Sequence, residues 1–244
     1  MTSIWHASIQ GMPWNEEKMN QAVQHLRRRA TVHFRVGVDT YENLTELDMN
    51  VFAARHDLIL HISNADPKAE FPSSFLGRLA QLKHVSALQL DCAQVQDLTI
   101  LGSVRKPMSI QGLEQMHGLE YLHVSLPKLE QCCDFSQMPR LRQLELVYMK
   151  SLQDIECLWT ARALEVLELK EINTAIKAAS FVRLAELERL RQVDFRFIDF
   201  NKGRIAAIRE QLIRQGKSHI IYEHIPEQQR LQSMAIEHLS QYLM

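Results

Sequence analysis

The stretch that decides the fold reads Leu141-Arg-Gln-Leu144-Glu-Leu146, and a matching hexad, Leu164-Glu-Val-Leu167-Glu-Leu169, begins 23 residues later. Both read apolar-x-x-apolar-x-apolar. The last three positions alternate as a short β-strand does, so Leu144 and Leu146 share one face and Glu145 lies on the other. One short strand cannot bury its apolar face alone, and the two hexads therefore predict strands stacked side by side.

Three further hexads have the same form: Val85-Ser-Ala-Leu88-Gln-Leu90, Leu119-Glu-Tyr-Leu122-His-Val124 and Leu190-Arg-Gln-Val193-Asp-Phe195. Their second apolar positions, at 88, 122, 144, 167 and 193, are separated by 34, 22, 23 and 26 residues. Three of the steps fall within the period of leucine-rich repeats. The chain thus resembles an irregular, bacterial-type member of that family, although the Asn or Cys that usually follows the strand is poorly kept.

The resemblance implies an α/β solenoid in which each coil has one strand and one return segment. Val95 and Leu98, and later Leu152, Ile155 and Leu158, supply the apolar positions expected in returns. The 34-residue step contains Gly102, Pro107, Gly112 and Gly118, and it predicts one repeat with an irregular insertion. An all-helical array is the alternative, because LxxLxL also suits an amphipathic helix. Leu126-Pro127 and Met138-Pro139 break the helical phase and oppose it.

The ends of the chain are less regular. Val32-His-Phe34-Arg-Val36 and Leu58-Ile-Leu60-His-Ile62 alternate as strands do. A helix capped by Asn15 is expected ahead of them, with Met19, Val23 and Leu26 on its apolar face. We expect a helix over 204–214 with Ile205, Ile208 and Leu212 on one face and Gly216 at its end. A last strand at 220–222 and an amphipathic helix over 228–244 complete the prediction.

The prediction is therefore one domain, residues 1–244, with one parallel sheet of about eight strands and helical caps at both ends. Residues 1–60 form the N-terminal cap and degenerate repeats, 85–200 the clearest repeats, and 201–244 the C-terminal cap. No Pro/Gly/Ser-rich linker divides the chain.

Composition narrows the function classes. The formal net charge is −1 and the isoelectric point about 6.8, so the chain lacks the positive charge expected of a nucleic-acid-binding protein. No apolar run approaches 18 residues, and the N-terminus has no signal-peptide pattern, so we expect a cytoplasmic protein without a membrane span. The only basic run, Arg27-Arg28-Arg29, could touch phosphate with Arg35. It also suits a helix C-terminus, where positive charge complements the dipole.

No catalytic or cofactor motif occurs. The chain has neither GxGxxG nor GxxxxGK[ST], HExxH or GxSxG, and its 11 histidines are scattered. We expect no cofactor, no metal and no enzymatic activity, and we do not expect a small-molecule ligand. The cysteines, Cys92, Cys132, Cys133 and Cys157, are expected to be free thiols. Cys132 or Cys133 as a nucleophile is the alternative to buried structural cysteine.

The candidate binding surface is the concave sheet face, where outward side chains stand in columns. The central column reads Gln89, His123, Glu145, Glu168 and Asp194. We expect its three carboxylates to be exposed on adjacent strands, about 4.8 Å apart. They form either an ion-pair ladder with Lys170 and Arg196 or a docking stripe for a protein with a basic surface, with Tyr121 and His123 as an anchor.

These features predict a non-enzymatic protein-binding scaffold. Families of this architecture include inhibitors, adaptors and recognition subunits, and an immunity-type protein that neutralises a toxin is one concrete version. The alternative is a structural or adaptor subunit that docks through the C-terminal helix with Leu231, Met234, Leu239 and Leu243.

Overall fold

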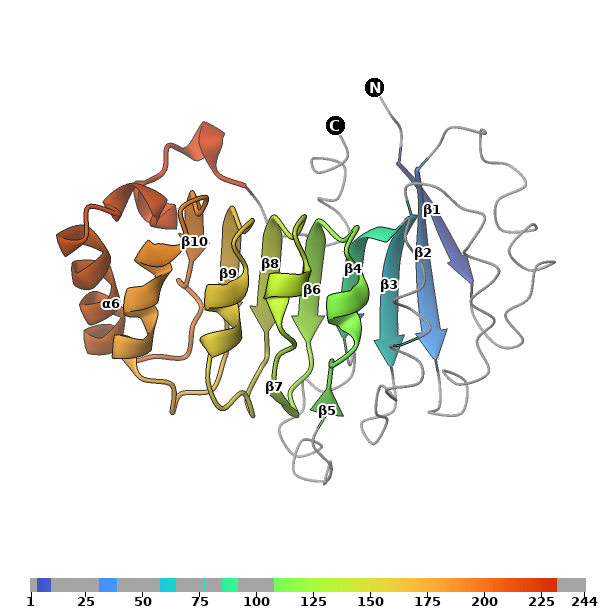
Figure 1. The fold of residues 1–244 in the computed structure, drawn as a ribbon, viewed down its shortest axis with the longest axis horizontal. Coiled ribbons are helices and arrows are strands. Elements are labelled where there is room, and N and C mark those ends of the chain that lie inside the picture. Colours follow the sequence, from blue (N-terminus) through green and yellow to red (C-terminus); the bar gives the residue numbers. More distant parts are fainter. Residues whose placement is uncertain are drawn as a thin grey trace.

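The computed structural model describes residues 4–9, 31–38, 58–64, 77, 85–91 and 108–231, with side-chain surroundings from residue 110 to residue 231. Its main feature is one parallel sheet whose strand order follows the chain, β1-β2-β3-β4-β6-β8-β9-β10 (Figure 1). The strands are β1 (Ile4–Ile9), β2 (Thr31–Val38), β3 (Leu58–Asn64), β4 (Val85–Asp91), β6 (Tyr121–Ser125), β8 (Gln143–Val147), β9 (Val166–Lys170) and β10 (Gln192–Asp194). Each strand pairs with the next one along the sequence, which is the arrangement of a solenoid.

The register confirms the spacing predicted from the hexads. Leu88 pairs with Leu122, Leu122 with Leu144, Leu144 with Leu167, and Leu167 with Val193. The degenerate early repeats continue the same row through Phe34 and Leu60. The unequal spacing of the hexads therefore reflects connecting segments of different length, while the strands themselves stay aligned.

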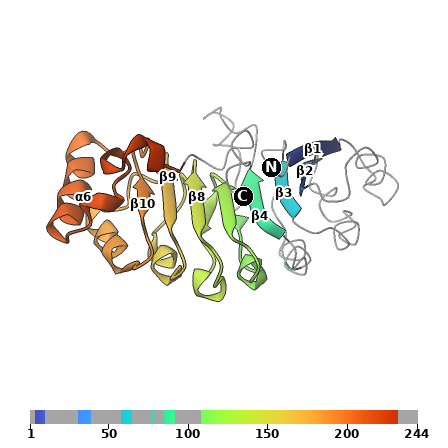
Figure 2. The same ribbon diagram turned by 90° about the horizontal axis from the view of Figure 1, so that it is seen from above.

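The return segments between the later strands are 3-10 helices, and Figure 2 shows them together on one side of the sheet. They are η1 (Leu113–Gln115), η2 (Phe135–Gln137), η3 (Glu156–Thr160) and η4 (Ala178–Glu186). β5 (Met108–Ser109) of the irregular repeat pairs with β7 (Leu129–Gln131), which follows β6, in a separate two-stranded sheet. Residues 92–107, with Val95 and Leu98, lie outside the described ranges.

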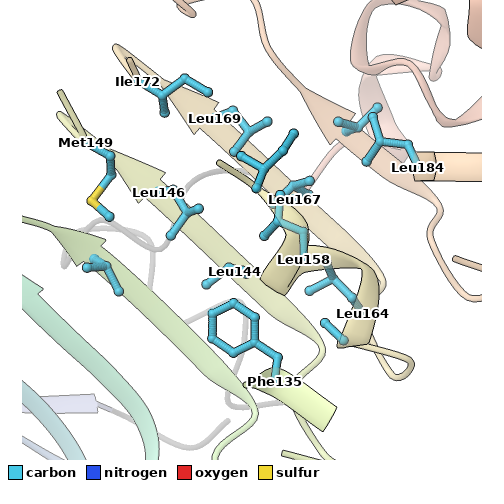
Figure 3. Close-up of a cluster of buried hydrophobic side chains, with 14 of the residues drawn as sticks. Phe135, Leu144, Leu146, Met149, Leu158, Leu164, Leu167, Leu169, Ile172 and Leu184 are labelled. Atoms are coloured by element: carbon cyan, nitrogen blue, oxygen red, sulfur yellow. The ribbon is translucent and has the colours of Figure 1, made fainter. Parts of the chain in front are cut away.

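The core fills the space between the sheet and the returns (Figure 3). The inward pairs Leu144 and Leu146, and Leu167 and Leu169, are at most 1% exposed, as predicted. Bulky return residues close the core from the other side, and the largest fully buried ones are Trp159, Phe135, Phe181 and Phe195. Each coil buries its leucines against the neighbouring coils, so the core is continuous along the solenoid.

The C-terminal cap includes the predicted helix, α6 (Lys202–Arg214). The Asn201 side chain accepts a hydrogen bond from the Arg204 amide at 2.9 Å and caps the N-terminus. Ile208 and Leu212 are fully buried. Gly216 ends the helix with φ +73°, a left-handed conformation that suits glycine.

The sheet differs from the prediction at both ends. The alternation in Ile4–Ile9 forms β1, which the hexad pattern does not contain. The strand expected at 220–222 is wrong: η5 (Ser218–Ile220) and η6 (Tyr222–His224) occupy this stretch, and only Ile221 bridges to Val193. Ile221 is the single extended residue between two tight turns, too little for a strand.

Two predicted helices fall outside the described ranges. One is the N-terminal helix that begins at Asn15, together with the arginine run 27–29. The other is the C-terminal helix, of which the structure describes only the start. There η7 (Glu227–Gln229) is a 3-10 helix that is followed by Arg230 and Leu231.

Candidate functional site

The outward side chains stand in the columns predicted from the sequence. In the central column His123 pairs with Glu145, Glu145 with Glu168, and Glu168 with Asp194. Three carboxylates therefore occupy consecutive strands on the sheet face turned away from the return segments, here called the polar face. The placement on one column is confirmed.

The predicted exposure of these carboxylates is wrong. Glu145 is completely buried and Asp194 is 5% exposed, while Glu168 is half-buried. The physical reason is lateral pairing. The Glu145 carboxylate accepts a hydrogen bond from Gln143 Nε2 at 2.9 Å and lies 2.8 Å from His123 Nδ1. A carboxylate that turns toward its neighbours along the sheet projects less into solvent, and alternation alone cannot predict that.

Asp194 is held by the residue two positions later. Its carboxylate accepts hydrogen bonds from the Arg196 backbone amide at 3.0 Å, from Nε at 3.0 Å and from Nη2 at 2.8 Å. The bidentate arginine pair is the strong form of this contact. Both partners, Asp194 and Arg196, lie at the end of the same strand, whereas the predicted ladder required ion pairs between neighbouring strands.

Glu168 is the carboxylate of the column whose ionisation its surroundings oppose. Burial, together with the charges of Glu145 and Asp194, raises the pKa of its carboxyl group to about 7, while His123 and Lys170 oppose the increase. Near neutral pH Glu168 is therefore only partly ionised, which relieves the repulsion expected from three adjacent carboxylates.

The column of outward side chains next to the central one is also inaccessible to solvent. Its members Tyr121, Gln143, Val166 and Gln192 are all buried. Tyr121 is only 8% exposed, so it does not offer the exposed anchor that the sequence predicted, and burial raises the pKa of its hydroxyl group. The Gln192 side chain forms two hydrogen bonds with the backbone of Leu231, of 2.7 Å and 2.8 Å.

Two residues beyond the central column, Lys170 and Arg196, belong to an exposed cluster at the edge of the polar face. Phe197 is 56% exposed, and the Lys170 ammonium and Arg196 guanidinium groups lie 5.8 Å and 5.1 Å from its ring centre. The Arg196 guanidinium group also stacks on the Tyr222 ring at 3.7 Å. We call Lys170, Arg196, Phe197 and Tyr222 the rim patch. Of the seven predicted site residues, it includes Lys170 and Arg196.

Phe197 is exposed because the last coil contains one extra residue at this point. The Tyr148 amide donates to the Lys170 carbonyl group on the next strand, at 3.0 Å. The equivalent amide, that of Glu171, donates to the carbonyl group of Phe197 and not to that of Arg196, which would lie opposite Lys170 if the register of β9 and β10 continued past Asp194. Phe197 follows Phe195 in an apolar-x-apolar alternation, but the strand itself ends at Asp194, so the alternation does not direct Phe197 inward.

Other chemistries find little support in the described part of the chain. It contains no group of three or more His, Cys, Asp or Glu side chains that could hold a metal ion, and none of its helices is long and apolar enough to cross a membrane. Cys132, Cys133 and Cys157 are free thiols, whereas Cys92 lies outside the described ranges. Burial raises the pKa of the Cys133 thiol far above its usual range, and a hydrogen bond with Cys157 raises that of Cys132. Both shifts oppose the thiolate that a nucleophile needs.

Comparison with known proteins gives no family assignment. No family model matches the chain, and no curated protein sequence matches it. Among solved structures, an internalin (inlF) from Listeria monocytogenes is 13% identical over 74% of this chain and 72% of its own, with a TM-score of 0.22. A likeness at that TM-score carries no argument about fold or function.

Proposed function

We propose that this chain is a non-enzymatic protein-binding scaffold of the leucine-rich-repeat type. The observation that carries the proposal is the rim patch, where an aromatic ring more than half exposed lies beside two cationic side chains. Leaving a phenylalanine side chain in water forfeits roughly 1.5–3 kcal/mol of hydrophobic stabilisation. Aromatic and arginine side chains are enriched among residues that dominate protein interfaces.

The geometry favours an apolar anchor over the acidic docking stripe expected from the sequence. A stripe would need exposed carboxylates, but Glu145 and Asp194 are buried and hydrogen-bonded. Arg196 is already oriented by Asp194 and by the Tyr222 ring, so little side-chain entropy is lost when a partner covers it. We therefore place the partner contact on Phe197 and Arg196, with the buried column as their support.

An immunity-type inhibitor of a toxin is the more specific form of this proposal. It is argued from the solenoid architecture, which inhibitors share with adaptors and recognition subunits. The adaptor alternative docks through the C-terminal helix. Of the four residues named for it, the structure describes Leu231, which lies against Gln192, while Met234, Leu239 and Leu243 lie outside the described ranges.

The proposal is tested with one matched pair of variants. Phe197→Ser and Ile213→Ser each remove an exposed large apolar side chain, since Ile213 on α6 is 50% exposed. Wild-type and variant chains capture proteins from a native lysate, and the captured proteins are quantified by mass spectrometry. We expect a protein that Phe197→Ser loses at least tenfold and Ile213→Ser retains. Identical capture by all three chains would contradict the proposal.

A further inference from the structure

A groove of about 590 Å³ lies at the start of β10, beside the turns that carry Tyr222. Three segments line it: the entry to β10 with Arg191 and Gln192, the turns with His219, His224, Ile225 and Pro226, and the chain after η7 with Gln229 and Leu231. Its volume is in the range of ordinary ligand sites.

The lining combines cationic and amide groups with apolar ones. The described lining residues include an arginine, two histidines and the exposed amide of Gln229, but no carboxylate. Ile225, Pro226 and Leu231 supply an apolar surface beside them. A small anion alone would leave that apolar surface without a contact, so the lining suits an oxyanion attached to an apolar body.

The arginine is oriented with donors to spare. Arg191 Nε lies 3.1 Å from Glu165 Oε2, and over residues 110–231 the guanidinium group has no ion-pair partner other than Glu165. Glu165 is itself satisfied by Arg142, whose Nε lies at 2.8 Å from Oε1. One carboxylate thus faces two guanidinium groups, and positive charge remains at the groove. A guanidinium group held by Nε presents its terminal nitrogens as a bidentate site for carboxylate or phosphate.

One histidine ring is also fixed. His224 Nδ1 lies 3.0 Å from the carbonyl oxygen of Ser218. A carbonyl oxygen only accepts, so Nδ1 carries the hydrogen, and Nε2 of the neutral ring is an acceptor that does not donate to an oxyanion. The Gln192 amide is occupied by Leu231 and fixes the groove wall rather than offering a donor.

We propose that this groove binds an organic oxyanion, a phosphate ester or a carboxylate, on an aromatic or aliphatic body. The Arg191 guanidinium group and His219 receive the oxyanion, and Ile225, Pro226 and Leu231 contact the apolar body. The site does not depend on the protein-binding function proposed above.

The test is a titration of the full chain followed by amide and arginine Nε–H chemical shifts in NMR spectra. The probes are phenyl phosphate and benzoate, with phenol and inorganic phosphate as comparisons. We expect saturable shifts at Arg191 and Gln229 with at least one of the two aromatic anions. Phenol and inorganic phosphate should bind at least tenfold more weakly. If neither aromatic anion gives saturable shifts, or if inorganic phosphate binds equally well as an adventitious ion only, the proposal is overturned.

Two substitutions form a matched pair. Arg191→Gln and Arg142→Gln each remove one arginine from Glu165, but only Arg191 lines the groove. We expect at least a tenfold loss of affinity for Arg191→Gln and less than a twofold change for Arg142→Gln. Equal losses would show a nonspecific charge effect and refute the site. Should Arg191→Gln fail to fold, His219→Asn, at an exposed residue, must weaken binding several-fold for the proposal to stand.

Discussion

At the scale of single residues, Glu168 is the group whose ionisation the fold opposes most clearly. Its carboxyl group is buried beside Glu145 and Asp194, and its pKa rises from 4.5 to about 7. The native state therefore retains a proton that the unfolded chain has already released. Stability should fall as the pH rises from about 4.5 to about 7 and then level off.

Glu168→Gln tests this sign. We expect the variant to be more stable than the wild type above pH 7, by at most roughly 3 kcal/mol, because each unit of pKa shift corresponds to about 1.4 kcal/mol. The difference should disappear near pH 4.5. Urea denaturation at several pH values measures it. A variant less stable than the wild type at pH 8 would contradict the assignment.

Glu165→Gln is the matched control for this series. The hydrogen bond from Arg142 lowers the pKa of the Glu165 carboxyl group, so its charge stabilises the native state. The substitution should destabilise the protein at neutral pH, and the loss should shrink as the pH falls through the lowered pKa. The same Glu→Gln change is thus expected to lower stability at position 165 and to raise it at position 168.

The cysteines give a second residue-scale prediction. The mass of the native chain under non-reducing conditions should show four free thiols, since none of the described cysteines is bridged. In brief alkylation at neutral pH, Cys133 should remain unlabelled because burial raises its pKa far above that of an ordinary thiol. Denatured protein, in which all four cysteines should react, is the control. A native disulfide or rapid labelling of Cys133 would count against the packing described here.

At the scale of elements, Leu167 tests the stacking of coils. It is fully buried and pairs in register with Leu144 and Val193. Leu167→Ala should lower the free energy of unfolding by roughly 2–5 kcal/mol, because it leaves a cavity between three coils. The control, Ile213→Ala, removes a side chain that is 50% exposed and should cost far less. A loss below about 1 kcal/mol at Leu167 in chemical denaturation would reject the register.

Strands were more predictable than the other elements. Inward positions such as Leu122 and Leu146 follow directly from alternation, and every hexad from residue 85 onward contains a strand. Ile220-Ile221-Tyr222 is apolar enough for another strand, yet it folds into 3-10 turns. Ile220 and Ile221 are buried as their apolar character predicts, whereas the hydrogen-bonded neighbours decide whether the short segment is extended.

At the scale of the molecule, the solenoid order was predictable, and the exposure of side chains on the polar face was not. Each strand needs its sequence neighbour for burial, so a repeat of about 23 residues leads to a parallel sheet in chain order. The fate of the outward side chains depends on contacts that alternation does not encode. His123 and Gln143 hold Glu145 against the face, and one extra residue turns Phe197 outward.

The most direct test of the central claim is site-specific photocrosslinking in the native host. A photoreactive benzoylphenylalanine replaces Phe197 in one variant and Ile213 in another, because both side chains are at least half exposed. We predict an ultraviolet-dependent adduct with another protein from position 197 and none from position 213. If position 197 gives no adduct, or if both positions give the same adducts in equal amounts, the rim patch is not the binding surface.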